Sequence, residues 1–459
     1  MTTYTNRIGY ADISDYGAIA DDVRDNSSAI QAALDTGIPV YVPGTTSSFN
    51  FATRLTIPSG AVFFGNGNAQ SSQTGLPSTL KYTGTGTAMG VNLGGSTTSM
   101  NSHIRGLNIT TTQTTGGRWA IELNSATNVF IAWNTIQNFT KATGASGAIE
   151  VSGTIGADDI TVFHNRIVNN STCIHQGTTG ASDVISGWRI IGNQFTGSYA
   201  AGGQDGALQI ARPVQAMLFV GNDVNANANP NEIFFGDLVN GLVLDGNFIN
   251  STAAARNALK FGGTDLKGIS VQGNFMYQSA ANGTGRAVWF SAAGGDGILV
   301  RGNFINLYAT VTNPAIDPGG FNFTNSDFTG NSINGAGANL SFGTFGASST
   351  GTIWPYSLTN PTYGTSVAID RSLGSTFRIT ATNNTAFTVA NPTNAITGLP
   401  LMVVIRNTSG GALGTVTWDT LYKLSTWTSP ATANSRSITF VYDGTNWVEV
   451  NRAASDVPN

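Results

Sequence analysis

An asparagine that recurs at nearly constant spacing is the feature that most restricts how this chain can fold. Segments such as VFIAWNTI, ITVFHNRI and LVLDGNFI align on it, and neighbouring copies lie 25 to 31 residues apart. The aligned residues are Asn134, Asn165, Asn193, Asn222, Asn247, Asn274, Asn303 and Asn331, with Asn108 in IRGLNITT as a weaker earlier copy. A repeat of this length indicates an array of stacked units, each built from the same few elements.

Apolar residues alternate with polar ones around each asparagine. Ile131 and Ile136 stand three residues before and two residues after Asn134, and the later copies repeat this pattern. Alternation with period two predicts short β-strands, and stacked coils can bury an apolar side that a single strand would leave exposed. We therefore predict an all-β, right-handed parallel β-helix in which the asparagine side chains sit at turns and hydrogen-bond to one another along the stack.

Other repeat architectures fit the sequence less well. A leucine-rich solenoid would need a regular leucine pattern, a helical solenoid would need a 3.6-residue period, and the segments show neither. Blades of a β-propeller need about 40–45 residues, which exceeds this spacing. Composition agrees with stacked coils, because only 10% of residues are charged and 57 are glycine, which accepts the positive φ that tight turns need.

Charge and targeting signals exclude several classes of partner. A net charge of −4 gives no basic surface for nucleic acid. The N-terminal MTTYTNRIGYADIS lacks the apolar segment of a signal peptide, and no run of about 18 apolar residues predicts membrane insertion. The single cysteine, Cys173, cannot form an intrachain disulfide, and the three scattered histidines predict no metal site. We expect no cofactor.

The two ends of the chain differ from the repeat region. Residues 1–45 are predicted to form a cap with a short helix, begun by a capping box from Ser28 to Gln31, and the first strand. Residues 46–345 form the β-helix, and residues 346–374 are interpreted as a linker. Residues 375–459 are predicted to form a small β domain for trimerisation or carbohydrate binding, with a hairpin that turns near Asp443 and Gly444.

The segment DYGAIADD…DNSSAIQAAL resembles the start of the pectate-lyase-like β-helix superfamily, and TNWVEVNR resembles the ends of phage tail fibres and tailspikes. Asp22 departs from the superfamily motif, which usually has glycine there. The residues that match the motif are Gly17, Ala18, Asp21, Asp25, Ala29, Ile30 and Gln31. The resemblance implies a homotrimeric phage tailspike depolymerase, held on the tail or baseplate of the virion and acting on polysaccharide at the bacterial surface. Only about eleven residues precede the motif, so we expect that an anchoring domain has been removed or that attachment occurs differently.

A second strand precedes each asparagine, in the segments WAIEL, GAIEV, TCIHQ, GALQI, EIFFG, NALKF and AVWFS. Aligning their apolar residues predicts one outward column: Glu122, Glu150, His175, Gln209, Phe234, Lys260 and Trp289. Stacked strands lie about 4.8 Å apart, so Glu122 and Glu150 become neighbouring carboxylates with His175 beside them. Like charges on adjacent strands destabilise a sheet, so a structural role alone explains this pair poorly.

Neighbouring carboxylates favour a state in which one is protonated and the other ionised, as glycoside hydrolysis requires. We expect Glu122 and Glu150 to be catalytic, with His175 as a helper. Phe234 and Trp289 would then offer flat faces to sugar rings, and the complete set of expected substrate-binding residues is Gln209, Phe234, Lys260, Arg286 and Trp289. The competing interpretation is a solvated face on which the glutamates simply point into water.

Three further hypotheses remain open. A polysaccharide lyase would use His175 or Lys260 as the base for β-elimination on a uronic-acid polymer. A non-catalytic adhesin would only grip the polysaccharide, and a purely structural spike is disfavoured by the aromatic and acidic column. A second outward column, which we expect to be exposed and to form the trimer contact, consists of Ala132, Phe163, Ile191 and Val220.

Overall fold

The computed structural model divides the chain into two compact units, Met1–Thr352 and Ile353–Asn459. The residues that it describes are 9–67, 75–91, 101–113, 119–140, 146–152, 157–177, 184–196, 206–225, 231–251, 257–278, 285–291, 294–307, 313–319, 323–328, 330–334, 358–371, 374–395 and 397–459.

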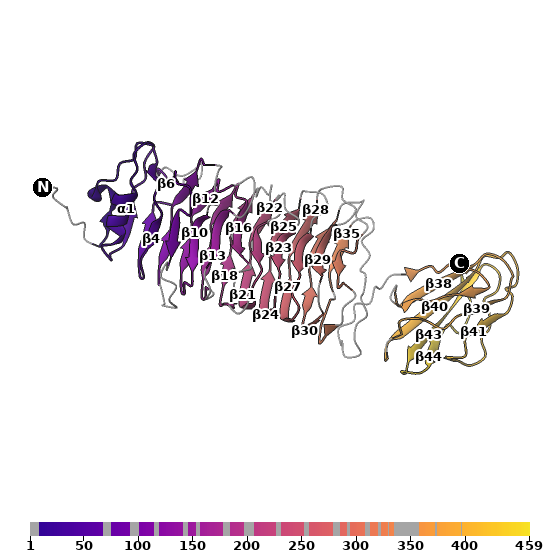
Figure 1. Ribbon diagram of the computed structural model, residues 1–459. Coiled ribbons are helices and arrows are strands. Elements are labelled where there is room, and N and C mark those ends of the chain that lie inside the picture. Colours follow the sequence, from indigo (N-terminus) through magenta and orange to yellow (C-terminus); the bar gives the residue numbers. More distant parts are fainter. Residues whose placement is uncertain are drawn as a thin grey trace. The chain divides into compact units, whose positions relative to one another are not determined.

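Three parallel sheets run along the first unit, and successive coils add strands to each of them (Figure 1). The first sheet contains β1 (Ala11–Asp12), β2 (Val40–Val42), β5 (Val62–Gly65), β8 (His103–Arg105), β11 (Phe130–Ala132), β14 (Thr161–Phe163), β17 (Ile185–Ser186), β18 (Arg189–Ile191), β21 (Val214–Val220), β24 (Val239–Asp245), β27 (Leu266–Gln272), β30 (Gly295–Asp296), β31 (Leu299–Arg301) and β34 (Phe323–Thr324).

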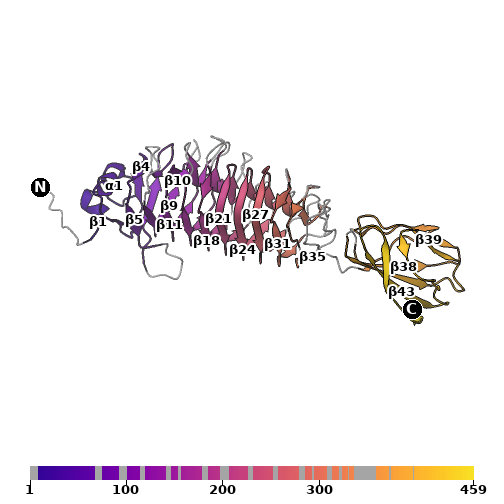
Figure 2. The same ribbon diagram turned by 90° about the horizontal axis from the view of Figure 1, so that it is seen from below.

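The other two sheets complete each coil (Figure 2). The second sheet contains β4 (Leu55–Ile57), β7 (Met89–Val91), β10 (Trp119–Asn124), β13 (Gly147–Ser152), β16 (Thr172–Gln176), β20 (Leu208–Ile210), β23 (Asn231–Phe235), β26 (Asn257–Phe261), β29 (Arg286–Phe290) and β33 (Ile316–Asp317). The third sheet contains β3 (Phe49–Phe51), β6 (Thr79–Tyr82), β9 (Asn108–Thr111), β12 (Thr135–Gln137), β15 (Arg166–Val168), β19 (Gln194–Thr196), β22 (Asp223–Asn225), β25 (Phe248–Ser251), β28 (Phe275–Gln278), β32 (Phe304–Asn306) and β35 (Ser332–Asn334). The predicted right-handed parallel β-helix is confirmed.

Apolar columns from the three sheets fill the interior of the coils. On the first sheet the column three residues before each asparagine is 0% exposed, and it comprises Ile131, Val162, Ile190, Phe219, Leu244, Val271 and Val300. The corresponding column of the third sheet, from Ile136 to Ile305, is at most 2% exposed. Burial of one such side chain contributes roughly 1.5–3 kcal/mol, and repetition along the stack makes the interior the main source of stability.

The repeated asparagines form the predicted amide ladder at the turn between the first and third sheets. From Asn134 to Asn331, each Nδ2 donates to Oδ1 of the next asparagine at 2.8 to 3.1 Å. Asn108 is not part of it, because Leu107 stands at the ladder position and its N–H donates to Asn134 at 3.0 Å. Asn108 instead pairs with Thr135 at the start of the third-sheet strands.

The helix α1 (Ser27–Leu34) packs its buried Ile30 and Leu34 at the N-terminal end of the β-helix, after the 3-10 helix η1 (Ile13–Tyr16). The predicted capping box is wrong, because the helix begins after Asn26 and Gln31 does not fold back on its N-terminus. The Gln31 amide instead exchanges two hydrogen bonds with the backbone of Thr56, at 3.1 and 2.9 Å. This side chain therefore joins the cap to the strand β4.

The second unit contains a seven-stranded and a three-stranded sheet around its own apolar core. The larger sheet holds β36 (Leu358–Thr359), β38 (Thr376–Ala381), β40 (Pro400–Asn407), β42 (Tyr422–Lys423), β43 (Asn434–Tyr442), β44 (Trp447–Arg452) and β45 (Val457–Pro458), and the smaller holds β37 (Ser366–Val367), β39 (Phe387–Val389) and β41 (Val416–Trp418). Strands β36 and β37 come from the stretch interpreted as a linker. The predicted hairpin is present, because β43 and β44 pair antiparallel across Asp443 and Gly444.

Candidate functional site

The second sheet aligns the predicted outward column in the expected order. Glu122 pairs with Glu150, and Glu150 pairs with His175. The same register continues through Gln209, Phe234, Lys260 and Trp289, and it ends at Asp317. Residues from coils far apart in the sequence thus become direct neighbours along one face of the β-helix.

Arg54, which the sequence patterns did not single out, contacts the first glutamate of the column. Its Nη2 atom lies 2.6 Å from Oε2 of Glu122, and the hydroxyl of Ser152 donates to Oε1 of the same carboxylate. Both oxygens of Glu122 therefore have a partner. Gly90 occupies the column position directly before Glu122.

Glu150 has different surroundings. Its Oε1 atom lies 3.8 Å from Nδ1 of His175, and the side chain of Glu150 is 22% exposed. His175 was expected to face solvent, but it is only 6% exposed. The indole of Trp119 covers it, with the two rings stacked at 5.1 Å and an angle of 15°.

A glycine makes this stacking possible. Trp119 lies in register with Gly147, and a Cβ atom added to that glycine would come within 2.7 Å of the indole ring. The sequence contains a signal for this stacking, since the Trp that begins WAIEL is replaced by Gly at the equivalent position of GAIEV, one coil later. The alignment of the outward column alone does not reveal it.

Cations occupy the aromatic end of the column. Nζ of Lys260 lies 5.3 Å from the centre of the Phe234 ring and 4.7 Å from that of Trp289. The guanidinium of Arg286 lies 4.5 Å from the Trp289 ring and pairs with Asp317 at 2.5 Å. Cation–π contacts of this kind hold the rings and charges together, so the aromatic faces are less open than the sequence indicated.

The apolar column on the first sheet is less exposed than expected. Ala132 is 0% exposed, and Phe163 is partly covered by edge contact with Trp133 at 5.6 Å between ring centres. A more exposed apolar column lies on the third sheet and consists of Phe248, Phe275 and Phe304, which we term the phenylalanine ladder. Its rings stack at 5.3 and 5.0 Å and remain 37 to 41% exposed.

Within the part of the chain that the structure describes, no three His, Cys, Asp or Glu side chains come together as a metal site. No helix among these residues is long and apolar enough to span a membrane. Burial raises the pKa of the Cys173 thiol, which keeps it in its unreactive protonated form.

The N-terminal part of the chain is similar to a known protein family. Residues 10–207 match the family model described as rhamnogalacturonase A/epimerase, pectate lyase-like. No curated protein matches the chain. Among solved structures, the Dettilon tailspike protein is 12% identical with a TM-score of 0.53, covering 95% of this chain and 76% of that chain.

Two other solved structures have lower TM-scores. The A-module of the mannuronan C-5 epimerase AlgE6 of Azotobacter vinelandii is 18% identical with a TM-score of 0.40, covering 73% of this chain and 97% of that one. PfbA, a surface adhesin of Streptococcus pneumoniae, is 13% identical with a TM-score of 0.46, covering 97% and 99%. The match to the pectate-lyase-like family model covers residues 10–207, less than half of the chain, and the comparison with the tailspike shows that the two proteins share the β-helix fold.

Proposed function

We propose that the chain binds a bacterial surface polysaccharide and cleaves it internally by glycosidic hydrolysis at Glu122 and Glu150. The observation that carries this proposal is a pair of neighbouring carboxylates in unlike surroundings. Glu122 lies between a guanidinium and a hydroxyl, whereas Glu150 lies beside a covered imidazole. Glycoside hydrolysis needs such an unequal pair, one to protonate the leaving oxygen and one to act as base or nucleophile.

The surroundings indicate how the two roles divide. The ion pair with Arg54 suits Glu122 to carry negative charge as the base or nucleophile. Glu150 has no arginine against it in the contacts that the structure describes, and we assign it the role of acid. His175 is buried under Trp119, so we assign it the positioning of Glu150 instead of a direct contact with substrate.

The rest of the column provides the substrate-binding part of the proposal. Gln209 offers an amide, while Lys260 and Arg286 offer cations held against Trp289. Charged donors of this kind hydrogen-bond well to sugar hydroxyl and carboxylate groups. Phe234 would support Lys260 and contact the apolar parts of the sugar.

A binding-only adhesin is the second candidate, and one contact favours it. The carboxylate of Glu122 already has partners on both oxygens, which suits a fixed structural ion pair. Elimination has less support, because its expected bases are covered: His175 by an indole ring, and Lys260 by two aromatic rings. A lyase would also form a double bond, which ultraviolet absorbance of the products detects.

The fold shared with a tailspike supports the remaining parts of the proposal. The chain would be a component of a phage tail and would contact the bacterial surface from the virion. We propose that it forms a homotrimer through the phenylalanine ladder, because this column is the more exposed apolar one.

Digestion of purified surface polysaccharide tests hydrolysis directly. Size-exclusion chromatography and mass analysis should show shortened chains with the unaltered protein. Glu122→Gln and Glu150→Gln should each lower the rate by about 10²–10⁴-fold, the usual contribution of general acid–base catalysis. Asp245→Asn is the matched control, because Asp245 is an exposed carboxylate on the first sheet.

Two results would count against hydrolysis. If both glutamine variants keep the full rate, the carboxylate pair is not the catalytic centre. If the polysaccharide is retained by the protein but its length never changes, the adhesin replaces the enzyme.

A further inference from the structure

One position of the first sheet has a left-handed backbone in coil after coil. In the pairing of β21, β24, β27 and β30, the residues before this position pair with the neighbouring strands, but the residue at this position does not. It is therefore an extra, outward-facing residue in the coil. Its successive occupants, all with φ between 48° and 75°, are Asp159, Gly187, Ala216, Gly241, Gly268, Gly297 and Asn325.

The middle of this column forms the floor of a groove of about 360 Å³, which we term the axial trench. Gly187, Ala216, Gly241 and Gly268 line it, so no side chain larger than a methyl group rises from the floor. Leu218 and Val243 form one wall. On the opposite side of the floor stand exposed polar residues, namely Gln215, Asn240, Lys267 and Asp296.

At Gly241 and Gly268, neighbouring atoms do not force the floor to be bare. A Cβ atom added to Gly241 would meet nothing closer than 3.5 Å, and one added to Gly268 nothing closer than 3.6 Å. At Gly187, in contrast, a Cβ atom would clash with Oδ1 of Asp159. The left-handed backbone restricts the choice but also accepts Asn and Asp, as Asn325 and Asp159 show in the same column. The sequence therefore keeps side chains out of the middle of the column and places them at its ends.

Polar groups close both ends of the trench. At one end Asp159 lies 4.0 Å from Arg189, and at the other Asn325 donates to Asp296 at 2.8 Å. The floor from Gly187 to Gly268 extends roughly 14 Å, since each coil adds about 4.8 Å. The ligand that fits is thus elongated and lies parallel to the axis of the β-helix.

We propose that the axial trench binds a segment of uncharged polysaccharide, at a distance from the carboxylate pair on the second sheet. The inference rests on the proposed function for its ligand, the same polymer, but it assigns a separate binding site. An apolar wall suits the C–H faces of sugar rings, and the opposite polar row supplies both donors and acceptors for hydroxyl groups.

Charge and backbone pairing favour an uncharged polysaccharide over a charged polymer or a peptide strand. Lys267 pairs with Asp265 at 2.8 Å and Arg189 with Asp159, and Asp296 adds a further carboxylate, so the trench has no excess of cations that would favour an acidic polymer. A peptide strand would add to a free sheet edge, whereas the trench crosses the middle of a sheet whose strands already pair on both sides. A ligand in the trench can therefore contact only side chains and not free backbone groups, and these side chains repeat once per coil.

The test uses the full chain with Glu150→Gln, so that bound polymer stays intact, and an array of purified bacterial capsular and O-antigen polysaccharides as the probe. At least one uncharged polysaccharide should retain the protein. The double change Leu218→Asp and Val243→Asp should weaken this retention by about tenfold or more, which corresponds to about 1.4 kcal/mol. Val184→Asp is the matched control, because Val184 and Leu218 are both 37% exposed and Val184 lies outside the trench.

Three outcomes would overturn the proposal: no uncharged polysaccharide retains the protein, the double variant binds as well as the control, or Leu218→Asp converts an oligomer into monomers. The last would make a second copy of the chain the occupant of the trench. The results distinguish failure of the trench proposal from failure of the hydrolysis proposal. If the trench test fails but polymer is still shortened in a Glu150-dependent way, only the trench proposal is rejected. If the trench variants weaken retention as expected but the polymer is never shortened, only hydrolysis is rejected.

Discussion

Arg54 gives Glu122 a partner that Glu150 lacks, although the two glutamates occupy equivalent positions in successive coils. The arginine directly precedes β4, and its guanidinium contacts the carboxylate. Trp119 lies over Gly147 and stacks on His175. At the scale of single residues, the difference between the two carboxylates thus depends on the long side chains of Arg54 and Trp119.

Replacement of Arg54 should lower the cleavage rate. Arg54→Gln removes the positive charge beside Glu122, so the rate should fall about tenfold. Arg54→Lys should restore part of the rate, because it keeps the charge but not the planar guanidinium. The rate of polymer shortening measures both effects.

Arg301→Gln is the control, since the Arg301 side chain is 50% exposed and lies on the first sheet. An unchanged cleavage rate in Arg54→Gln would mean that Arg54 has no influence on the reacting groups. The order of the column was predictable from sequence, because register follows from the apolar residues of each strand. The contact of Arg54 was not predictable, because a single long side chain leaves no periodic signal. The contact of Trp119 is indicated only by the pair WAIEL and GAIEV, which alignment of the outward column does not reveal.

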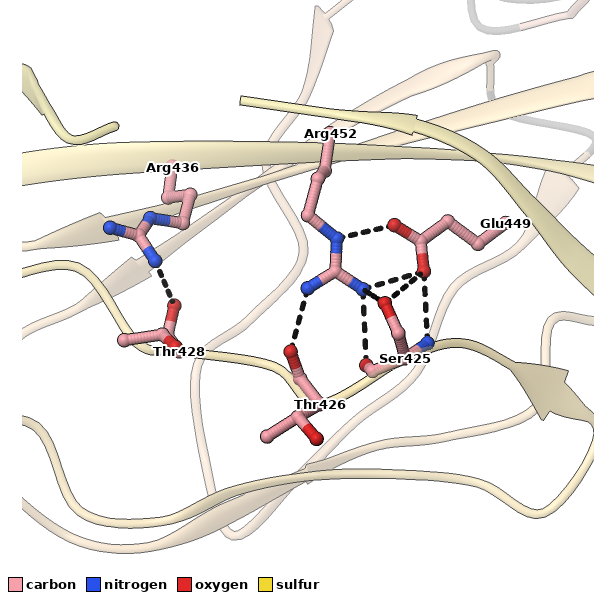
Figure 3. A network of polar contacts seen from close by, with 6 residues as sticks. All are labelled: Ser425, Thr426, Thr428, Arg436, Glu449 and Arg452. Carbon is pink, nitrogen blue, oxygen red and sulfur yellow. Dashed lines mark hydrogen bonds and ion pairs between the residues drawn. The ribbon is translucent and has the colours of Figure 1, made fainter. Parts of the chain in front are cut away.

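At the scale of elements, the hairpin β43–β44 is tied to the loop at residues 425–428 by a polar network (Figure 3). Arg452 pairs with Glu449 and donates to the carbonyl oxygens of Thr426 and Ser425 at 2.8 and 3.0 Å. Arg436 donates to the carbonyl of Thr428 at 3.0 Å. These contacts connect a loop to a strand pair without using any apolar surface.

This network makes the stability of the second unit sensitive to acid. The hydrogen bonds from Arg452 lower the pKa of Glu449 below its ordinary value of 4.5. The stabilisation is therefore fully present above that value and is lost as pH falls through the lower folded-state pKa. Thermal unfolding of the full chain between about pH 7 and pH 3 should show a smaller acid-induced loss in Glu449→Gln.

Thr426→Val is the control for this measurement, because the Thr426 carbonyl and not its hydroxyl accepts from Arg452. Identical acid sensitivity in Glu449→Gln and the unaltered chain would contradict the assignment. This hairpin was predictable, since Asp-Gly between two alternating strands is a local signal. The start of α1 was not predictable, because the Gln31 amide hydrogen-bonds to the backbone of Thr56, which is distant in the sequence.

At the scale of the whole β-helix, each of the three sheets carries a distinct outward surface. The second sheet carries the carboxylates, the first carries the axial trench, and the third carries the phenylalanine ladder. The fold was predictable because the asparagine repeat spans most of the coils. Which apolar column stays exposed was not predictable from alternation, because it depends on cover from neighbours such as Trp133.

A charge within the phenylalanine ladder should dissociate the proposed trimer. Phe275→Asp places a carboxylate between two stacked rings, and the mass measured by light scattering should fall to about one third of the trimer value. Val184→Asp, at an equally exposed position just before β17 of the first sheet, should leave the mass unchanged. A monomeric unaltered chain, or a trimeric Phe275→Asp variant, would exclude this contact.

The amide ladder has a consequence for how proteins of this kind change in length. Each Nδ2 in the ladder donates both to Oδ1 of the next asparagine and to a backbone carbonyl of the preceding coil, so the same set of hydrogen bonds is repeated from coil to coil. Insertion or deletion of one complete coil would again place an asparagine Nδ2 beside an asparagine Oδ1. A partial coil would instead place the amide beside a residue that cannot form this hydrogen bond. The length of the β-helix can therefore change during evolution by whole coils, without a change in the hydrogen bonds of any remaining asparagine.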